Sequence, residues 1–386
     1  MPDAYILGIE SSCDETAAAV VRSGEQLISN VVASQISTHQ PYGGVVPELA
    51  SREHLKAIVP VVRQALAEAN RTYDSVDAIA VTQGPGLAGA LLVGISYAKA
   101  LAFALNKPLI AINHLEGHIH AVLLEERQKG NRELQFPVLA LVVSGGHTHL
   151  YLASQKGDSW AYENIGHTRD DAAGEAFDKV AKLLGLGYPG GPIIDRLAIH
   201  GDPKAVKFSP AQIKHRDRCD RLDNRAVVPG DDRPRFDFSY SGIKTAILRY
   251  VETHNMQASI EARRKILAQI AKPTVDDYLA NSDRLTVDLV ASFQRAIVDD
   301  LVRKTLAAAA AANVATLFVT GGVAANQELR QTFEREAAKQ GLPVYFPSRR
   351  LSTDNAAMIA AAAYPKFLLK DFAGMDFSAE AGMVLR

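Results

Sequence analysis

The fold is set by a strand–turn–strand stretch near the start of the chain, YILGIESSCDETAAAVV (residues 5–21). Residues 5–10 and 17–21 have the apolar character of buried strands, and the turn between them consists mainly of hydroxyl and acidic residues. Backbone N–H groups and hydroxyls in such a turn suit a phosphate, whereas the carboxylates of Glu10 and Asp14 suit a metal ion or a water molecule. Turns of this composition are also common where no ligand binds, so other motifs must decide.

A similar arrangement recurs in the middle of the chain. Residues 136–143 predict a buried strand that ends in the turn Ser144-Gly145-Gly146, and residues 150–153 continue as a strand. The two glycines let the backbone lie close to a phosphate. Strand, small-residue turn and strand therefore occur twice, and this weak internal repeat suggests two related lobes of the α/β class.

Two histidines stand four residues apart in the stretch INHLEGHIH (residues 112–120). On a helix, His114 and His118 share one face about one turn apart, and two neutral imidazoles so placed can hold one metal ion. Because two ligands rarely suffice, the pair predicts a third ligand elsewhere in the chain. An ordinary pair of buried or surface histidines is the alternative.

Acidic residues stand at the start of two predicted helices. Asp170 and Asp171 begin a helix that runs to about residue 184, and Asp354 precedes a helix over residues 356–367. An N-cap or a first-turn acid explains each of them without any function. A ligand role for Asp354 therefore needs support from elsewhere.

Three further segments carry expectations about shape and surface. Residues 48–69 have helical periodicity, and Pro60 within them predicts a kink or a break into two helices. Residues 203–235 carry many lysines and arginines among acids, which is typical of a solvated surface and, less often, of nucleic-acid contact. Residues 371–386 are predicted to form a surface extension.

The bulk composition excludes several classes of protein. A chain of 386 residues is long enough for two domains, and its formal net charge of −1 excludes a globally basic nucleic-acid binder, although not a local basic stripe. The two cysteines, Cys13 and Cys219, provide no disulfide framework, which suits a reducing cytoplasm. The start resembles no signal peptide, and no apolar run approaches about 20 residues, so we expect a cytoplasmic protein that does not use a membrane.

Taken together, these motifs resemble one family, the universal tRNA N6-adenosine threonylcarbamoyltransferases (TsaD), which older usage called O-sialoglycoprotein endopeptidases. The resemblance covers nearly the whole chain in order, and as a set its motifs are highly specific. It rests on residues 8–16, 114–118, 143–148, 170–179, 321–326 and 353–355.

The resemblance implies the fold shared by actin, sugar kinases and heat-shock ATPases, in which two RNase-H-like α/β lobes face a nucleotide cleft. We expect residues 1–112 with 352–386 to form the N-terminal lobe, and residues 113–351 to form the C-terminal lobe. Residues 210–233 and 254–283 look longer than in typical bacterial members. These two insertions put partner surfaces and tRNA docking in doubt, but not the chemistry.

The resemblance also implies the site residues. It assigns one divalent metal ion, iron or zinc, to His114, His118 and Asp354, and such a set with open positions is what a catalytic ion needs. It assigns the adenylate to a set of residues that each have the expected type in this chain, with Asp178 and Asp195 accepting from ribose hydroxyls. The set is Val142, Val143, Ser144, Gly145, Gly146, Asp178, Gly191, Asp195 and Asn326.

The reaction implied by the family transfers a threonylcarbamoyl group from threonylcarbamoyl-adenylate to N6 of adenosine 37 in tRNAs that read ANN codons, and releases AMP. An aromatic amine is a weak nucleophile, so the mixed anhydride must supply the activation. A carboxylate could take the amine proton, and Glu10 and Asp14 are the candidates between which the sequence does not choose. The implied partners are tRNA, a paralogous inactive subunit and a small ATPase.

Three other functions compete with this one. A zinc protease of the His-Glu-x-x-His type needs Glu next to its first His, whereas Glu116 lies two positions after His114, about 200° around a helix. A small-molecule kinase of the same superfamily would normally hold Mg²⁺ on carboxylates, against which the histidine pair argues. A nucleotide-dependent scaffold would bind adenylate and transfer nothing.

Overall fold

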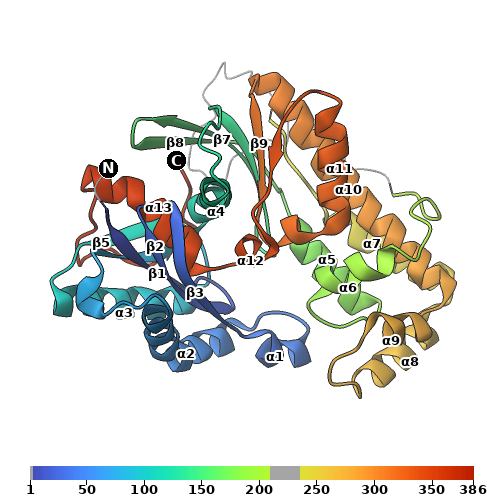
Figure 1. The fold of residues 1–386 in the computed structure, drawn as a ribbon. Coiled ribbons are helices and arrows are strands. Elements are labelled where there is room, and N and C mark those ends of the chain that lie inside the picture. Colours follow the sequence, from blue (N-terminus) through green and yellow to red (C-terminus); the bar gives the residue numbers. More distant parts are fainter. Residues whose placement is uncertain (1–2, 209–234) are drawn as a thin grey trace.

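Two five-stranded sheets form the framework of the protein. The computed structural model describes residues 3–208 and 235–386. In the first sheet the strand order is β3-β2-β1-β4-β5, and in the second it is β8-β7-β6-β9-β10 (Figure 1). The strands are β1 (Tyr5–Glu10), β2 (Glu15–Arg22), β3 (Gln26–Ser34), β4 (Ala78–Gly84), β5 (Leu109–Asn113), β6 (Val138–Val143), β7 (Thr148–Lys156), β8 (Ser159–His167), β9 (Thr316–Thr320) and β10 (Val344–Tyr345).

The two sheets repeat one topology. Strands β1, β2 and β3 pair antiparallel, and β1, β4 and β5 pair parallel. Strands β6, β7 and β8 likewise pair antiparallel, whereas β6, β9 and β10 pair parallel. The doubled strand–turn–strand pattern of the sequence is therefore a doubled fold, as expected for two RNase-H-like lobes.

Helices cover both faces of each sheet. Helices α2 and α3 pack on one face of the first sheet and α13 on the other, while α5, α6, α10 and α11 contribute to the main core of the second lobe. The helices are α1 (Ile36–His39), α2 (Pro47–Glu68), α3 (Ala88–Leu105), α4 (His114–Gln128), α5 (Ala173–Leu183), α6 (Gly190–Ala198), α7 (Ser241–Thr253), α8 (Gln257–Leu267), α9 (Val275–Ala280), α10 (Arg284–Ala312), α11 (Gln327–Ala338), α12 (Arg349–Ser352) and α13 (Ala356–Leu369), with short 3-10 turns at Gln40–Tyr42, Tyr73–Ser75 and Gly322–Ala325.

Helix α4 lies between the two lobes (Figure 1). Its residues Ala121 and Leu124 belong to the core of the first lobe, whereas Leu115 and Ile119 pack with strands of the second sheet. Burial on both sides explains why this helix lacks a polar face, although it carries three histidines. The lobe boundaries predicted at residues 112 and 352 stay a prediction.

Helix α13 approaches strand β1 closely, and Gly8 permits this. A Cβ at Gly8 would lie 2.4 Å from the carbonyl oxygen of Ala356 and 2.9 Å from the nitrogen of Ala360. Gly321 plays the same part in the second lobe, because its φ is +94° and a Cβ there would lie 2.3 Å from the carbonyl oxygen of Val143. At both glycines, the backbone of one segment packs directly against the backbone of another.

Several expectations about shape require correction. Of the two outcomes predicted at Pro60, a kink or a break into two helices, the break does not occur. Helix α2 runs through Pro60 as one helix, because Pro60 and Lys56 are exposed and the unpaired carbonyl can be solvated. The segment after α13 is not a plain surface extension: Ala373 N–H donates to Leu109 O, Glu380 N–H donates to Gln83 O, and Leu385 is buried.

The two predicted insertions fare differently. Residues 254–283 form helices α8 and α9, which pack beside α6 and α10. Residues 210–233, with most of the basic segment, lie outside the described residues. Within the described part, one helix, α3, is long and apolar enough to cross a membrane by length and composition alone, and a third of that window is buried.

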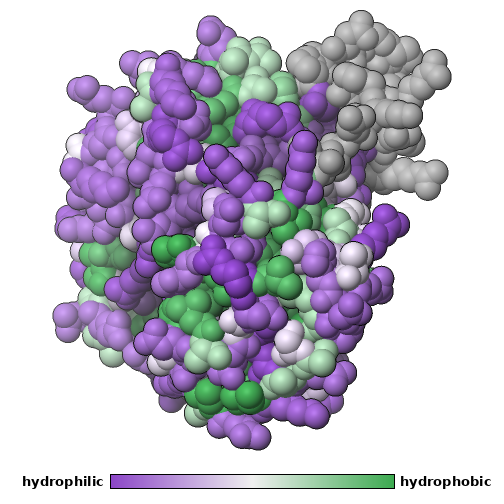
Figure 2. All heavy atoms as spheres, turned by 90° about the vertical axis from the view of Figure 1, so that its right-hand side faces the viewer, coloured by the Kyte–Doolittle hydropathy of each residue, from purple (hydrophilic) through white to green (hydrophobic). Residues whose placement is uncertain are grey.

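The side of the second lobe that carries α7 to α11 is mainly hydrophilic. Figure 2 shows this face, on which green apolar patches are separated by purple polar ones. Exposed apolar side chains on these elements include Leu248, Ile266 and Leu285. Isolated apolar residues of this kind are ordinary on a protein surface.

Candidate active site

Three predicted metal ligands come together where α4 and α13 begin. His114 is the first residue of α4, because Asn113 caps the helix through a bond from Leu115 N–H to its Oδ1. Asn355 caps α13 by accepting from Met358 N–H. Asp354 is therefore not the N-cap, and its carboxylate faces the histidines instead.

The geometry of this cluster fits a metal ion. Oδ1 of Asp354 lies 3.5 Å from Nε2 of His114 and 3.2 Å from Nε2 of His118, and one ligand atom from each residue falls within 4.8 Å of the others. Both ring nitrogens of His118 are buried, and apart from the contact between Nε2 and Asp354 neither has a polar partner among the described residues. Two buried imidazoles and a carboxylate that converge on one point are the arrangement that a bound cation would complete.

The other nitrogen of His114 is held by an outer layer of residues. Its Nδ1 lies 3.1 Å from Oε2 of Glu10 and 3.2 Å from Oγ of Ser12. A carboxylate in this position fixes the orientation and tautomer of a metal-binding imidazole. Thr82 Oγ1 donates to the same carboxylate at 2.6 Å, so Glu10 is itself locked in place.

The carboxylates of the cluster favour a positive charge on the neighbouring imidazole. Burial alone would lower the pKa of His114, but the carboxylates of Asp354 and Glu10 outweigh it and raise this pKa to about 10. Burial likewise opposes ionisation of Asp354, yet His114 and His118 hold its pKa well below the usual range. The His114 imidazole between them therefore lowers the pKa of both Glu10 and Asp354, against the effect of burial.

The two candidate bases differ in their surroundings. Glu10 is fully buried and also accepts from Ser12 N–H, so its hydrogen-bonding capacity is largely used. Asp14 is only partly buried, and burial with the nearby Asp354 charge raises its pKa. The hydroxyl of Tyr188 from the second lobe lies 3.4 Å from Oδ2 of Asp14, so Asp14 stands where the lobes meet.

The predicted adenylate residues surround the ends of β6 and β9. Val142 and Val143 are the last residues of β6, and the turn from Ser144 to Gly146 follows directly. A Cβ added at Gly145, Gly146 or Gly191 would meet no described atom within 4 Å, so the backbone is open for a ligand at each of them.

Three polar residues of the predicted adenylate set hold the surrounding backbone. Asp178 on α5 accepts from Gly190 N–H at 2.7 Å, and burial raises its pKa to about 6. Asp195 on α6 accepts from Gln327 N–H, and Asn326 caps α11 by accepting from Leu329 N–H. Asp195 and Asn326 therefore meet at the start of α11, whereas Asp178 belongs to the neighbouring α5–α6 corner.

The alternative assignment of Asp170 and Asp171 as caps of α5 is wrong. Helix α5 begins at Ala173 with Ala172 at the N-cap position. Asp170 instead accepts from Tyr240 N–H, Ser241 N–H and two serine hydroxyls at the start of α7. Asp171 pairs with Lys179 at 2.6 Å.

Sequence reasoning missed several residues of this region. Ser12 and Thr82 act on His114 and Glu10, and Tyr188 reaches Asp14 from the other lobe. The ring centroid of His147, which follows the turn after β6, lies 6.0 Å from that of His114. The sequence signal that could have indicated these residues is a polar residue at the end of a buried strand.

Glu116 faces away from the metal cluster. It lies 3.6 Å from Nζ of Lys366 and 3.5 Å from the hydroxyl of Tyr162, on the other side of α4. In a zinc protease of the His-Glu-x-x-His type the glutamate lies beside the metal, so this arrangement does not support a protease.

A doubled RNase-H-like topology with a candidate metal site where the lobes meet defines the class. The protein is an α/β protein of the actin, sugar-kinase and heat-shock-ATPase type. The solved structure of full-length HypF in its phosphate- and nucleotide-bound form has this fold: it aligns with a TM-score of 0.53 at 13% identity, covering 96% of this chain and 47% of that chain.

Sequence comparison identifies the family within this class. The family model described as TsaD, tRNA N6-adenosine threonylcarbamoyltransferase, matches residues 26–361. Curated relatives with that name are 72% identical in Koribacter versatilis, over all of both chains, and 52% identical in Syntrophobacter fumaroxidans, over 93% of each chain. The chain belongs to the tRNA N6-adenosine threonylcarbamoyltransferase family, and it is an acyltransferase, as the motifs predicted.

Proposed function

We propose that the cluster of His114, His118 and Asp354 is the centre at which this chain transfers the threonylcarbamoyl group of threonylcarbamoyl-adenylate to N6 of adenosine 37 in tRNAs that read ANN codons. The products are N6-threonylcarbamoyladenosine and AMP. The observation that carries the proposal is the meeting of three metal-type ligands from α4 and α13 in a chain of this family.

The three ligands would hold one divalent ion, which we take to be iron, with zinc as the alternative. When bound, such an ion supplies Lewis acidity toward an oxygen of the donor. Glu10 and Ser12 orient the His114 imidazole from behind, and Asp354 balances the charge. Glu10 is thus better suited to positioning than to taking a proton.

The adenylate would lie along the ends of β6 and β9. Open backbone at Gly145, Gly146 and Gly191 supports this placement. Val142, Val143 and Ser144 would form one edge of the adenylate site. Backbone N–H groups of the turn can donate to negative charge that develops on the threonylcarbamoyl-adenylate. The carboxylates of Asp178 and Asp195 would accept from ribose hydroxyls beside Asn326.

We infer that Asp14 is the general base that takes the proton from the N6 amine of adenosine. Its carboxylate is only partly buried, stands at the meeting of the two lobes and binds Tyr188 weakly, whereas Glu10 is enclosed. Adenosine 37 lies in the anticodon loop, where an unpaired base can be turned out of its stack into a protein pocket.

We propose further that this chain acts with partner subunits in the cytoplasm. The near-neutral net charge of −1 supports a tRNA surface that is shared with other subunits. We take these to be a paralogous inactive subunit and a small ATPase, acting together with this chain in the cytoplasm.

The test is transfer of labelled threonine from pre-made threonylcarbamoyl-adenylate to unmodified tRNA with the partner proteins added. Wild type, His114→Ala and the exposed control His200→Ala would be compared. Transfer by wild type and the control only would support the proposal. Equal transfer by His114→Ala would refute the catalytic role of the cluster, and no transfer by folded wild type would favour the kinase or scaffold functions.

A further inference from the structure

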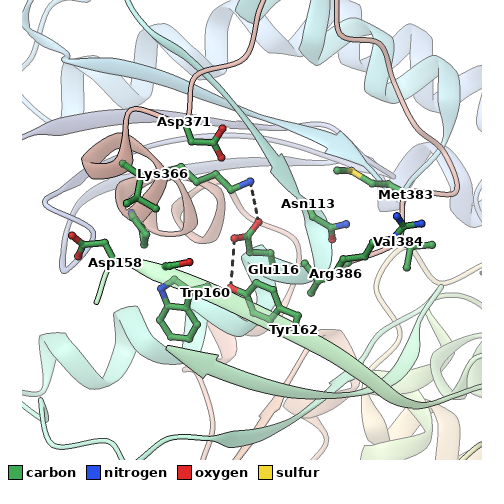
Figure 3. Close-up of a pocket in the computed structure, with 14 residues that line it drawn as sticks. Asn113, Glu116, Asp158, Trp160, Tyr162, Lys366, Asp371, Met383, Val384 and Arg386 are labelled. Carbon is green, nitrogen blue, oxygen red and sulfur yellow. Dashed lines mark hydrogen bonds and ion pairs between the residues drawn. The ribbon is translucent and has the colours of Figure 1, made fainter. Parts of the chain in front are cut away.

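A cavity of about 340 Å³ lies on the side of α4 that faces away from the metal cluster (Figure 3). It is lined by the start of α4, strand β8, the end of α13 and residues 383–386, and it opens to solvent. Its volume is at the lower end of the range for small-molecule sites. A ligand of a few heavy atoms is therefore the appropriate occupant.

Asn113 presents an unpaired donor to this cavity. The side chain is 3% exposed, and its Oδ1 already accepts from Leu115 N–H as the cap of α4. That bond fixes which end of the amide is oxygen, so the free end is the Nδ2 group, which has no hydrogen-bond partner among the described residues. A buried donor without a partner is costly unless a ligand or water satisfies it.

Trp160 presents a second such donor. Its indole lines the cavity, and the Nε1–H group is buried without an acceptor in the described part of the chain. Figure 3 places Trp160 and Asp158 toward one end of the cavity and Asn113, Val384 and Arg386 toward the other. The two unpaired donors are therefore separated along the cavity.

Charged groups of both signs line the space between these donors. Glu116 is 5% exposed, and its contacts of 3.6 Å to Lys366 and 3.5 Å to Tyr162 are both long. Figure 3 shows Glu116 in the middle of the cavity, and the exposed side chains of Asp158, Asp371 and Arg386 also line it. A ligand that carries one positive and one negative group matches this lining better than a purely anionic or cationic one.

We propose that this cavity binds a small free α-amino acid with a polar side chain. Asn113 Nδ2 and Arg386 would hold the carboxylate, Glu116 would hold the ammonium group, and the indole N–H of Trp160 would donate to an oxygen on the side chain. The ligand would touch the helix that carries His114 and His118 without entering their cluster. This inference does not rest on the proposed transfer reaction.

The test is binding of L-serine to the full chain, measured by calorimetry or ligand-observed NMR. We expect saturable binding at one site with a Kd below about 1 mM. Ethanolamine, which lacks the carboxylate, and 3-hydroxypropanoate, which lacks the ammonium group, should each bind about tenfold more weakly or worse, because each loses a charge-assisted contact. L-Alanine should also bind more weakly than L-serine.

Two conservative variants tie the binding to this cavity. Asn113→Asp retains the cap of α4 but replaces the donor by a carboxylate, and it should weaken L-serine binding about tenfold or more. Trp160→Phe retains a ring but removes Nε1–H, and it should bind L-serine and L-alanine equally. If either of these variants fails to fold, the exposed variant Arg386→Ala, which leaves the buried residues intact, provides the test. It should weaken the binding of both amino acids.

Two results would overturn the proposal. One is no saturable binding of L-serine up to about 10 mM. The other is binding that is unchanged in the folded cavity variants, because the amino acid would then bind elsewhere. Neither result would bear on the threonylcarbamoyl transfer, which has a separate assay.

Discussion

The substitution Gly8→Ala tests whether the contact between α13 and β1 positions the proposed metal ligands. The added Cβ would lie 2.4 Å from the carbonyl oxygen of Ala356, whereas ordinary contacts begin at 3.4 Å. Backbone must therefore shift by about 1 Å, and Asp354 lies two residues before Ala356 on the same segment. Asp354 now lies only 3.2–3.5 Å from the two histidine nitrogens, so such a shift removes it from ligand distance.

We expect two measurable effects of Gly8→Ala. Overpacking against backbone should lower the free energy of unfolding by about 1–3 kcal/mol. Displacement of Asp354 should raise the dissociation constant of the divalent ion about 10- to 100-fold. Urea unfolding of the metal-free protein and a competitive metal titration would measure the two quantities.

Gly242→Ala is the matched control. Gly242 lies in the first turn of α7, and a Cβ there would meet no described atom within 4 Å. This control should change the free energy of unfolding by at most about 1 kcal/mol, in the stabilising direction, because alanine favours a helix. If Gly8→Ala has wild-type stability and wild-type metal affinity, the reasoning about this contact is refuted.

Three other predictions concern caps, pH and a buried charge. Asn355→Ala should destabilise the fold by about 1 kcal/mol or more in urea unfolding, because it removes the bond from Met358 N–H and the bonds to the carbonyl oxygens of Leu351 and Thr353. Wild-type stability would contradict the cap. Since the pKa of Asp178 is raised to about 6, the affinity for adenosine, which has no group that titrates near this pH, should rise as pH increases through 6, and Asp178→Asn should flatten the profile. A pH-dependent variant would exclude Asp178. The same shift means that ionisation of Asp178 disfavours the fold as pH rises from about 4 to 6, so stability there should fall less in the variant. Arg263 is buried and donates to Asn281 O, Leu184 O and Thr286 Oγ1. Arg263→Met should lower the free energy of unfolding by about 2–4 kcal/mol without changing metal affinity. An unchanged free energy of unfolding would contradict a stabilising role for these three bonds.

Local patterns predicted the parts of the site that lie within single segments. The spacing of His114 and His118 placed them on one helix face, and the repeated strand–turn–strand pattern indicated two related lobes. Both rest on short periodicities that the sequence displays directly.

The proposed third ligand, Asp354, could not be deduced in this way. Asp354 is far from the histidines in sequence, and the cap of a helix explained it equally well. Only the folded chain shows that Asn355 takes the cap and leaves Asp354 facing the imidazoles. The family resemblance, rather than local pattern, supplied this residue.

Other features depend on tertiary context that no local pattern reports. The solvent beside Pro60 lets α2 continue, and pairing with Leu109 and Gln83 holds residues 373 and 380 against the first lobe. The cavity behind Glu116 arises because β8, α13 and residues 383–386 converge on α4.

In the proposed reaction, transfer depends on a metal ion held by His114, His118 and Asp354. The most direct test strips the protein with a chelator, adds Fe²⁺ or Zn²⁺ in steps, and measures both bound metal and transfer of labelled threonine to tRNA with the partner proteins present. We expect transfer to rise in proportion to bound metal up to one ion per chain, and we expect His118→Ala neither to bind the ion tightly nor to transfer. Full transfer by the stripped protein, or by His118→Ala, would contradict this dependence.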